Sequence, residues 1–477
     1  MRAEILNPFV HKLELDNTYD KIRTAIFTVI LLPFRVIVIC YLIVTAWFLA
    51  CIGLYGLSEE DLRRQPMTGW RRSLKPLICF IGKMSYLAGG MAISIRGRQA
   101  SRKEAPILVV APHSSFLDSC IVYATRMSSV IVRKESMDNY VGKLINYTQP
   151  VYVWRDDPNS RQNTIKEIIE RATSKEEWPQ VLIFPEGTCT NRSCLITFKP
   201  GGFYPGVPVQ PVTIRYPNAK DTVTWTWEGP GALKLLWLTL TQVHSSCEIE
   251  FLPVYYPSEE ERRDPKLYAR NVRDVMAKAL GVPVLDYTYD DCKLIARAKQ
   301  LGIPSAPSCR EISELRGQLG LDRSHLELHL AAQGLQGRAR WLSKEEFAQR
   351  LGVPNNVHSQ RLFDIFVTRA TGLVNFPDYL LCAAFLSLQH APLSQLLSYA
   401  FKLYDPAGNG RIKPVNFEEI ATRCLGLCQE EAQNTFQQAD VDEKGYITFD
   451  EFTAFAQKRN EFSFIFVSDP SHKPKTQ

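Results

Sequence analysis

An uncharged apolar run near the N-terminus constrains this chain more than any other feature. From Val36 to Leu57 the sequence reads VIVICYLIVTAWFLACIGLYGL, which matches the roughly 20 residues that an α-helix needs to cross the hydrocarbon of a bilayer. Glu59 and Glu60 follow almost directly, whereas a cleavable signal peptide has a shorter apolar region and ends in small residues. We therefore expect a membrane anchor at residues 36–57.

The charges around this segment do not set its orientation. Basic residues flank it on both sides, with Lys21, Arg23 and Arg35 before it and Arg63, Arg64, Arg71 and Arg72 after it, so the enrichment of Lys and Arg in cytoplasmic loops gives no answer. Pro33 interrupts a longer apolar region and would kink it. Two arrangements stay open: a single span, or a hairpin that enters and leaves the bilayer on one side.

Short apolar runs separated by helical stretches predict an α/β domain further along the chain. We expect a helix at 160–174, where Ile165, Ile168 and Ala172 repeat with helical spacing. A second apolar stretch at 77–95 contains Lys83 and is expected to lie at the membrane interface or partly buried. The predicted strands are 107–111, 130–132, 151–153, 181–184, 209–214 and 247–254.

After about residue 290 the sequence becomes strand-poor, and Leu-rich amphipathic runs at 313–335 and 343–351 predict an all-helical domain. The expected order of parts is an N-terminal segment (1–35), the membrane anchor (36–57), an interfacial helical segment (58–105), the α/β domain (106–290), a helical connector (291–360), a helical domain with calcium-like loops (361–460) and a tail (461–477).

Length, charge and cysteine content exclude several classes of protein. A chain of 477 residues that is 45% hydrophobic is too long for one core and too apolar for disorder. The sequence has a net charge of +6 but lacks the dense basic stripes of a nucleic-acid binder. This mild positive charge suits an anionic membrane surface or a phosphorylated substrate. The 12 cysteines have no CxxC spacing, so we expect reduced thiols and no zinc site.

A histidine and an aspartate follow the predicted strand at 107–111. His113 comes at the carboxyl end of this strand, where open α/β sheets bind their ligands. Asp118, five residues on, is expected in the first turn of the next helix, where its carboxylate would accept the imidazole N–H and fix the tautomer. An imidazole held in this way can take a proton from a hydroxyl. The alternative is a capping or packing role for the pair.

Two further strand ends carry polar residues. The strand at 181–184 runs into Glu186, Gly187 and Thr188, and the strand at 151–153 leads to Arg155. Arginine is the preferred bidentate ligand of phosphate. The hydroxyls of Thr188 and Thr190 and the ammonium of Lys199 would contact phosphate oxygens, while glycine lets backbone amides approach them closely. Three polar strand ends in one sheet predict a cleft.

These residues resemble the glycerolipid acyltransferases that share an HxxxxD motif. His113–Asp118 resembles the first block of the family, Trp154-Arg155 the arginine block, Phe184–Thr188 the third and Val207–Val212 the fourth. The longer string FPEGTCTNRSCLITFKPG is similar to the lysophosphatidylcholine acyltransferases that carry C-terminal EF-hands.

The resemblance implies transfer of an acyl or acetyl group from a coenzyme A thioester to the free hydroxyl of a lysophospholipid, without a catalytic metal. It also implies roles for individual residues. His113 would be the base and Asp118 its orienter, while Leu117 departs from the aromatic residue usual in relatives. The acceptor would be bound or positioned by Arg155, Glu186, Gly187, Thr188 and Asn191.

Calcium-like loops occur near the C-terminus. A calcium EF-hand supplies oxygen ligands at loop positions 1, 3, 5, 7, 9 and 12, with glycine at 6. In the window 440–451 the fitting ligands are Asp440, Asp442, Tyr446 through its carbonyl, and Glu451, but Lys444 brings a cation to position 5. The windows 405–416 and 367–378 lack more ligands and have Asn416 and Asp378 at position 12. We expect calcium to bind weakly and at no more than one or two sites, with 440–451 the best candidate.

The sequence therefore predicts a membrane-bound acyltransferase that acts on lysophosphatidylcholine or its ether analogue, with membrane lipids and acyl-CoA as partners and no nucleic acid. A catalytically silent, calcium-responsive adaptor and a membrane thioesterase are the alternatives. Coenzyme A thioesters are made in the cytosol, so we expect the catalytic domain to face it. The terminal Lys473-Pro-Lys475-Thr-Gln477 resembles a retrieval signal for the endoplasmic reticulum. There is no G-x-S-x-G nucleophile elbow, which disfavours a serine hydrolase.

Overall fold

The computed structural model describes residues 7–15, 17–134, 142–154, 159–335, 338–389 and 391–466. The chain forms two compact units, Met1–Tyr289 and Asp290–Gln477. Arg155 and the C-terminal retrieval-like signal lie outside the described residues. Each unit is treated by itself below.

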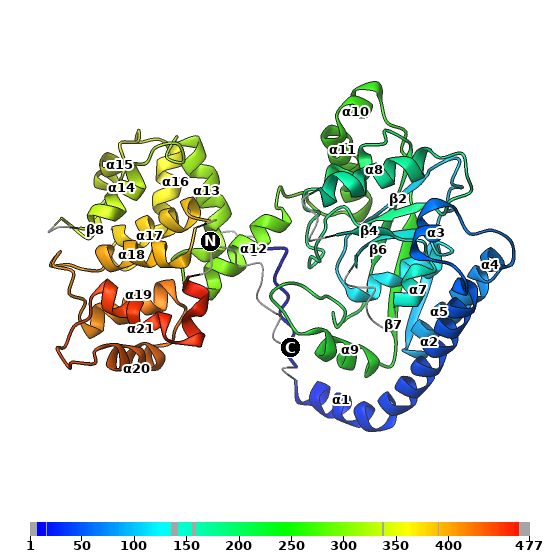
Figure 1. The fold of residues 1–477 in the computed structure, drawn as a ribbon, viewed down its shortest axis with the longest axis horizontal. Helices are drawn as coiled ribbons and strands as arrows, with labels where there is room; N and C mark the ends of the chain where they lie inside the picture. The colour runs from blue at the N-terminus through cyan, green and yellow to red at the C-terminus, as the bar shows by residue number, and fades with distance from the viewer. Residues whose placement is uncertain are drawn as a thin grey trace. The chain divides into compact units, whose positions relative to one another are not determined.

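A seven-stranded sheet forms the centre of the first unit (Figure 1). The strand order is β1-β7-β6-β2-β5-β3-β4, and the paired neighbours are parallel except β6 and β7, which are antiparallel. The strands are β1 (Met91–Arg96), β2 (Ile107–Ala111), β3 (Ser129–Arg133), β4 (Val151–Val153), β5 (Val181–Ile183), β6 (Val209–Arg215) and β7 (Ser245–Phe251). The predicted α/β domain is confirmed, with all six expected strands in its mixed sheet.

Strand β1 was not predicted. It lies in the apolar stretch 77–95, whose first part forms helix α5 (Lys75–Ala88), and it precedes the domain boundary expected at residue 106. Its residues pair in parallel register with β7, from Met91 opposite Ser245 to Arg96 opposite Glu250. Because a partner so distant in sequence defines the strand, a local apolar pattern did not separate it from the helix before it.

Helices cover both faces of the sheet. Alternate residues of β2 point to opposite faces, and all five are fully buried. Ile107 and Val109 belong to the core formed with α8 (Ser160–Thr173) and α11 (Pro265–Leu280), whereas Leu108 and Val110 belong to the core that includes α6 (Cys120–Ala124). The result is a layered α/β/α unit. The ends of its central strands are left uncovered at one edge of the sheet. The predicted helix at 160–174 is confirmed by α8.

The predicted membrane helix is present, and a separate helix precedes it. Helix α1 (Thr18–Ile30) and helix α2 (Leu32–Leu54) meet at Leu31, and they run in different directions (Figure 1). Pro33 lies in the first turn of α2, where a missing N–H costs no hydrogen bond. Helix α2 has a mean hydropathy of 2.6 and is long and apolar enough to cross a bilayer. It starts and ends a few residues before the predicted range 36–57, and Gly56 follows it with φ +76°.

One side of α2 is docked on the α/β domain. Ala46, Ala50 and Gly53 are buried on this side, and a Cβ at Gly53 would come within 2.4 Å of the Tyr147 ring. The guanidinium of Arg35 donates to the carbonyls of Leu240, Gln242 and Val243 at 2.8, 2.5 and 2.9 Å. The opposite side exposes Ile37, Tyr41, Val44 and Phe48. An exposed apolar face on a docked helix suits contact with lipid.

The remaining helices of the first unit are short connectors and covers. They are α3 (Glu59–Arg64), α4 (Gly69–Ser73), α7 (Gly142–Asn146), α9 (Ala232–Leu240) and α10 (Glu259–Arg263), with the 3₁₀ turns η1 (Phe116–Ser119) and η3 (Pro200–Phe203).

The second unit is helical, as predicted, apart from the small sheet of β8 (Trp341–Leu342) and β9 (Val374–Asn375). Its helices are α13 (Cys309–Gln318), α14 (Leu326–Gln333), α15 (Lys344–Leu351), α16 (Val357–Phe366), α17 (Phe376–Ser387), α18 (Leu393–Leu403), α19 (Pro414–Cys424), α20 (Gln429–Ala439) and α21 (Phe449–Gln457), with the 3₁₀ turns η4 (Ala306–Ser308) and η5 (Asn460–Ile465). Helix α12 (Tyr289–Gln300) begins at the division between the units. A β-bridge between Ile412 and Ile447 joins the two calcium-like loops.

Candidate active site

His113 and Asp118 meet just beyond the carboxyl end of β2. The Nδ1 atom of His113 lies 2.8 Å from Oδ2 of Asp118, and the side chain of His113 is 25% exposed while that of Asp118 is 1% exposed. The same Oδ2 accepts the backbone N–H groups of Ser114 at 2.7 Å and Ser115 at 2.9 Å. A rigid carboxylate therefore holds the imidazole by Nδ1 and leaves Nε2 as the nitrogen available for a substrate proton.

Tyr216, which follows β6, completes the shell of Asp118. Its hydroxyl donates to Oδ1 of Asp118 at 2.6 Å, so both carboxylate oxygens accept hydrogen bonds. The Phe184 ring lies 4.3 Å from the His113 ring, centroid to centroid, with an interplanar angle of 31°. Sequence reasoning missed Tyr216, although its position at the end of a predicted strand was a usable signal.

The surroundings of His113 act on its pKa in opposite directions. Burial of the ring lowers the pKa of His113, while hydrogen bonds to Asp118 and Cys189 outweigh that effect and raise it to about 10. The carboxylate effect is the one that the geometry supports directly, since Asp118 lies at hydrogen-bonding distance. His113 consequently holds a proton more firmly than a free imidazole does, and base catalysis by it should strengthen as pH rises.

Glu186 lies beneath His113 rather than at the surface. It is 1% exposed; its Oε2 accepts the backbone N–H of His113 at 2.7 Å and its Oε1 accepts that of Ile196 at 3.3 Å. Burial raises the pKa of Glu186 to about 7. The resemblance implied that Glu186 binds or positions the acceptor. Its geometry suits a residue that positions the loop of His113 better than one that contacts substrate.

Gly187, Thr188 and Lys199 form the exposed rim next to this buried layer. Gly187 has φ +66°, and a Cβ at that position would come within 2.6 Å of the Lys199 Nζ. Glycine is therefore required both by the left-handed backbone and by the close approach of the ammonium. Thr190, by contrast, is fully buried, and its N–H donates to the carbonyl of His113 at 2.7 Å.

Asn191 is tied to the start of the chain. Its side-chain amide donates to the carbonyls of Asn7 at 3.0 Å and Val10 at 2.9 Å, and its backbone N–H donates to the carbonyl of Pro8 at 2.8 Å. The N–H of His11 continues the contact to the carbonyl of Glu228 at 2.8 Å. We call residues 7–11 the N-terminal strap. No pattern in the sequence pointed to the strap, because its pairing is defined only by residues some 180 positions away.

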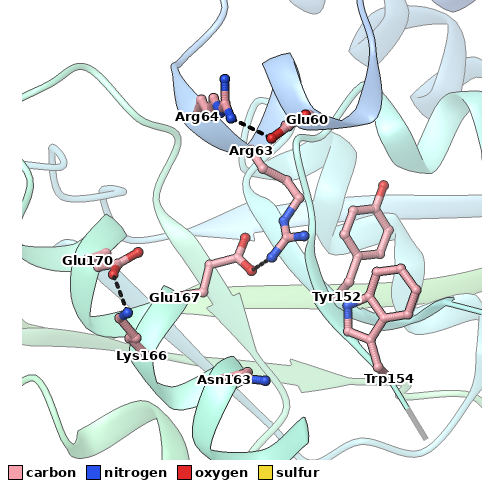
Figure 2. Close-up of a pocket in the computed structure, with 9 residues that line it drawn as sticks. All are labelled: Glu60, Arg63, Arg64, Tyr152, Trp154, Asn163, Lys166, Glu167 and Glu170. Carbon is pink, nitrogen blue, oxygen red and sulfur yellow. Dashed lines mark hydrogen bonds and ion pairs between the residues drawn. The ribbon is translucent and has the colours of Figure 1, made fainter. Parts of the chain in front are cut away.

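An open groove of about 710 Å³ lies elsewhere on the first unit, between α3, the end of β4 and α8. Figure 2 shows its charged side chains directed at one another: Arg63 at Glu167, Arg64 at Glu60 and Lys166 at Glu170, at 3.2, 2.5 and 3.8 Å. Neither His113 nor Asp118 lines it. Because its cations and carboxylates neutralise each other, this groove offers no net charge to a phosphorylated substrate.

The loop at 440–451 carries an internal cation among its acidic groups. The ammonium of Lys444 pairs with Glu451 and lies 3.7 Å from Asp442, and both oxygens of Asp440 accept backbone N–H groups of the loop, those of Lys444 and Gly445. Tyr446 lies beside the same ammonium. Within the described residues no group of three or more His, Cys, Asp or Glu is arranged to hold a metal ion. The carboxylates present thus fit calcium poorly while Lys444 occupies their centre.

The other two calcium-like loops have structural contacts instead. Asp405 is 4% exposed and accepts the N–H groups of Ala407, Gly408 and Gly410. Asp378 accepts the hydroxyl of Tyr404 at 2.7 Å and pairs with Arg423.

Comparisons with known proteins agree with this division. The acyltransferase family matches residues 92–215, and the EF-hand domain pair matches residues 395–457. The first match begins in β1 and contains His113, Asp118 and Glu186, and the second contains the loops at 405–416 and 440–451. The fold and the site define an acyltransferase with an EF-hand pair.

Full-length relatives narrow the class. The chain is 44% identical to "Lysophosphatidylcholine acyltransferase" of Drosophila melanogaster, over 98% of this chain and 89% of the relative. It is 44% identical to "Lysophosphatidylcholine acyltransferase 1" of Homo sapiens, over 96% and 86%. A solved 1-acyl-sn-glycerophosphate acyltransferase from Thermotoga maritima aligns with 54% of this chain and 98% of its own, at 20% identity and a TM-score of 0.36. The chain belongs to the lysophosphatidylcholine acyltransferase family.

Proposed function

We propose that this enzyme transfers an acyl or acetyl group from a coenzyme A thioester to the free hydroxyl of lysophosphatidylcholine or its ether analogue. The observation that carries the proposal is the partly exposed His113, held through Nδ1 by the buried carboxylate of Asp118 at 2.8 Å.

His113 acts as a general base. Nε2 takes the proton of the lysophospholipid hydroxyl as the oxygen attacks the thioester carbonyl carbon. The tetrahedral intermediate collapses with loss of the coenzyme A thiolate, which receives the proton back from Nε2, so the imidazole is restored. Asp118 stabilises the imidazolium that exists between the two transfers. The reaction needs no metal and no covalent enzyme intermediate.

The rim of Gly187, Thr188 and Lys199 is the proposed contact for the phosphate of the acceptor. It is exposed or half-buried and adjoins the layer that holds His113. The ammonium of Lys199 packs against the Gly187 backbone, which keeps a positive charge within reach of an anion that enters beside His113. Arg155, at the end of β4 by sequence, is proposed as a further phosphate ligand. Asn191 would act indirectly, by fixing the loop to the strap.

The catalytic unit and both ends of the α1–α2 segment are proposed to lie on one side of the membrane, the cytosolic one. The strap precedes α1 in sequence, yet it hydrogen-bonds to Asn191 and Glu228, which come after α2. A single span would separate these partners by the bilayer. The 12 free cysteines are typical of a protein in a reducing compartment. An endoplasmic reticulum location goes with this orientation.

Calcium is proposed to bind weakly, at 440–451, through Asp440, Asp442, Glu451 and the carbonyl of Tyr446. A calcium ion there would have to displace the Lys444 ammonium from Glu451, and that competition is the reason for the low affinity.

Mass spectrometry of microsomes supplied with labelled acyl-CoA, with and without lysolipid, tests the proposal. An active transferase yields labelled phospholipid only with the acceptor; a thioesterase yields free fatty acid in both cases; a silent adaptor yields neither product. His113→Ala should abolish transfer while the protein stays in membranes. His244→Ala, at an exposed histidine, is the matched control. More than a tenth of wild-type transfer in His113→Ala would reject the role of His113.

A further inference from the structure

Arg192 lies behind the catalytic pair in a backbone conformation that disfavours arginine. Its φ is +65°, a region in which residues other than glycine are strained. The side chain is 17% exposed, and it is held from two sides: Nη1 donates to the Ser114 Oγ at 3.1 Å and Nη2 to Asp221 Oδ2 at 2.6 Å. Two hydrogen bonds therefore fix the position of this guanidinium.

Asp221 provides a firm anchor for this guanidinium. Its Oδ1 accepts the N–H of Thr224 at 3.1 Å, and its Oδ2 accepts the Thr224 hydroxyl at 2.6 Å. Its backbone carbonyl lies 2.9 Å from Nε2 of His11 in the strap. Burial raises the pKa of Asp221, but the charge of Arg192 and these hydrogen bonds outweigh it, so the pKa is lowered and the carboxylate stays ionised at neutral pH.

The guanidinium also covers Tyr216. The Arg192 Cζ lies 5.3 Å from the centroid of the Tyr216 ring, within the range of a cation–π contact. Tyr216 in turn donates to Oδ1 of Asp118, while Ser114, the other partner of Arg192, donates its N–H to Oδ2. Arg192 thus contacts two of the residues that hydrogen-bond to the Asp118 carboxylate, Ser114 and Tyr216.

We propose that Arg192, Tyr216 and Asp221 form a brace that positions Asp118 and limits how tightly His113 holds its proton. The inference rests on the proposed function. A cation over the ring makes the phenol a stronger donor, and donation to Oδ1 withdraws negative charge from Oδ2, which faces His113. The brace therefore works against the carboxylate's pull on the imidazole proton and keeps His113 usable as a base. All three are positioning residues.

Other titratable groups around this shell bear on any pH measurement. Those facing His113, Asp118 or Tyr216 are Glu186, Cys189, Cys120, Cys247, Arg192 and Asp221. Burial raises the pKa of Tyr216 well above its usual value, so its phenol remains a donor throughout the working range. Burial raises the pKa of Glu186 to about 7, so its titration falls inside the pH range of the assay, and each variant is compared with wild type over the same range.

Two variants remove parts of the brace without straining the fold. Tyr216→Phe deletes only the hydroxyl. Arg192→Gly deletes the guanidinium and relieves the left-handed backbone, because glycine adopts positive φ freely. Tyr256→Phe is the control for the first, at a tyrosine that is 67% exposed. Arg126→Gly is the control for the second, at an exposed arginine with φ +57° that follows α6 and precedes β3, at the strands' amino ends.

The full-length enzyme in microsomes is assayed for kcat, KM and the pH dependence of transfer. We expect kcat to fall about tenfold in both brace variants, the low end for a hydrogen bond to a charged group, with KM within about twofold. The acid limb of the curve of kcat against pH should move to higher pH by about half a unit or more. Controls should match wild type. A merely structural role would lower kcat without moving the limb, and that result would overturn the brace.

A second readout does not depend on turnover. The side chain of His113 is partly exposed, so its modification by diethyl pyrocarbonate, followed by peptide mass spectrometry as a function of pH, reports its protonation. Reactivity should require higher pH in Tyr216→Phe and Arg192→Gly. Unchanged profiles in both variants reject the brace even if wild-type transfer is normal. Absence of His113-dependent transfer in the wild type would instead reject the proposed function.

Discussion

The substitution Asp118→Asn separates two roles of the carboxylate, as acceptor for Nδ1 of His113 and as the negative charge that stabilises the imidazolium. The structure determines which way round the amide group must lie. Oδ2 receives three donors, from Ser114, Ser115 and His113, whereas Oδ1 receives only the Tyr216 hydroxyl. If the asparagine NH₂ replaced Oδ2, it would face three N–H groups with no acceptor. The amide oxygen should therefore take the Oδ2 position, and the Tyr216 hydroxyl can rotate to accept from the NH₂.

This orientation predicts a moderate loss rather than a collapse of activity. The amide oxygen still accepts from Nδ1, so the tautomer of His113 is kept and Nε2 still faces substrate. What is lost is the negative charge that stabilises the imidazolium. A hydrogen bond to a charged group contributes about 1.5–3 kcal/mol and a neutral one about 0.5–1.5. The difference between the two, about 1–1.5 kcal/mol, corresponds to a fall of about tenfold in kcat.

The assay is the pH dependence of acyl transfer, with thermal unfolding as the check on folding. Burial lowers the pKa of His113, while Asp118 and Cys189 raise it, so in Asp118→Asn the acid limb of the pH–rate profile should move to lower pH while the plateau drops about tenfold. Asp274→Asn, at an exposed helical position, is the control. A drop beyond about ten-thousandfold without a shift of the limb would mean that the tautomer had inverted, and would refute this reasoning.

Three further predictions address the rim, the calcium loop and the topology. Gly187→Ala should raise KM for the lysolipid about tenfold with little change in kcat, because a Cβ displaces Lys199 from its place; a loss confined to kcat, in kinetics at saturating acyl-CoA, would contradict the rim. Lys444→Gln should tighten calcium binding measured by isothermal titration, since it frees Glu451; unchanged affinity would show that the ammonium does not compete. In sealed microsomes an impermeant maleimide should label the exposed Cys428, with Cys428→Ser as control; labelling only after permeabilisation would put this residue in the lumen. The sequence Asn146-Tyr147-Thr148 is an acceptor motif for N-glycosylation, but glycosylation is the poorer test, because Asn146 is 8% exposed and its side chain accepts a hydrogen bond from the Tyr152 hydroxyl.

Much of the architecture could be predicted from the sequence, because the determining patterns are local. Strands buried on both faces read as short apolar runs, and all six expected ones are present. The boundary of the helical unit was expected near residue 290, and the division falls after Tyr289. The membrane helix was misplaced by only a few residues, since Pro33 allows it to begin earlier and Gly56 ends it. Strand β1 was not predicted, because its partner β7 is remote in sequence.

At the site, the sequence by itself predicted that His113 and Asp118, which follow one strand, form a pair, and in the structure Nδ1 of His113 lies 2.8 Å from the Asp118 carboxylate. The tertiary structure decided which of the other polar residues can meet a substrate. It buries Glu186 beneath His113, leaves Lys199 exposed, and ties Asn191 to a strap at the opposite end of the first unit's sequence. Tyr216 entered the site in the same way. The physical reason is that burial and long-range hydrogen bonds depend on what the fold brings together, which no local spacing encodes.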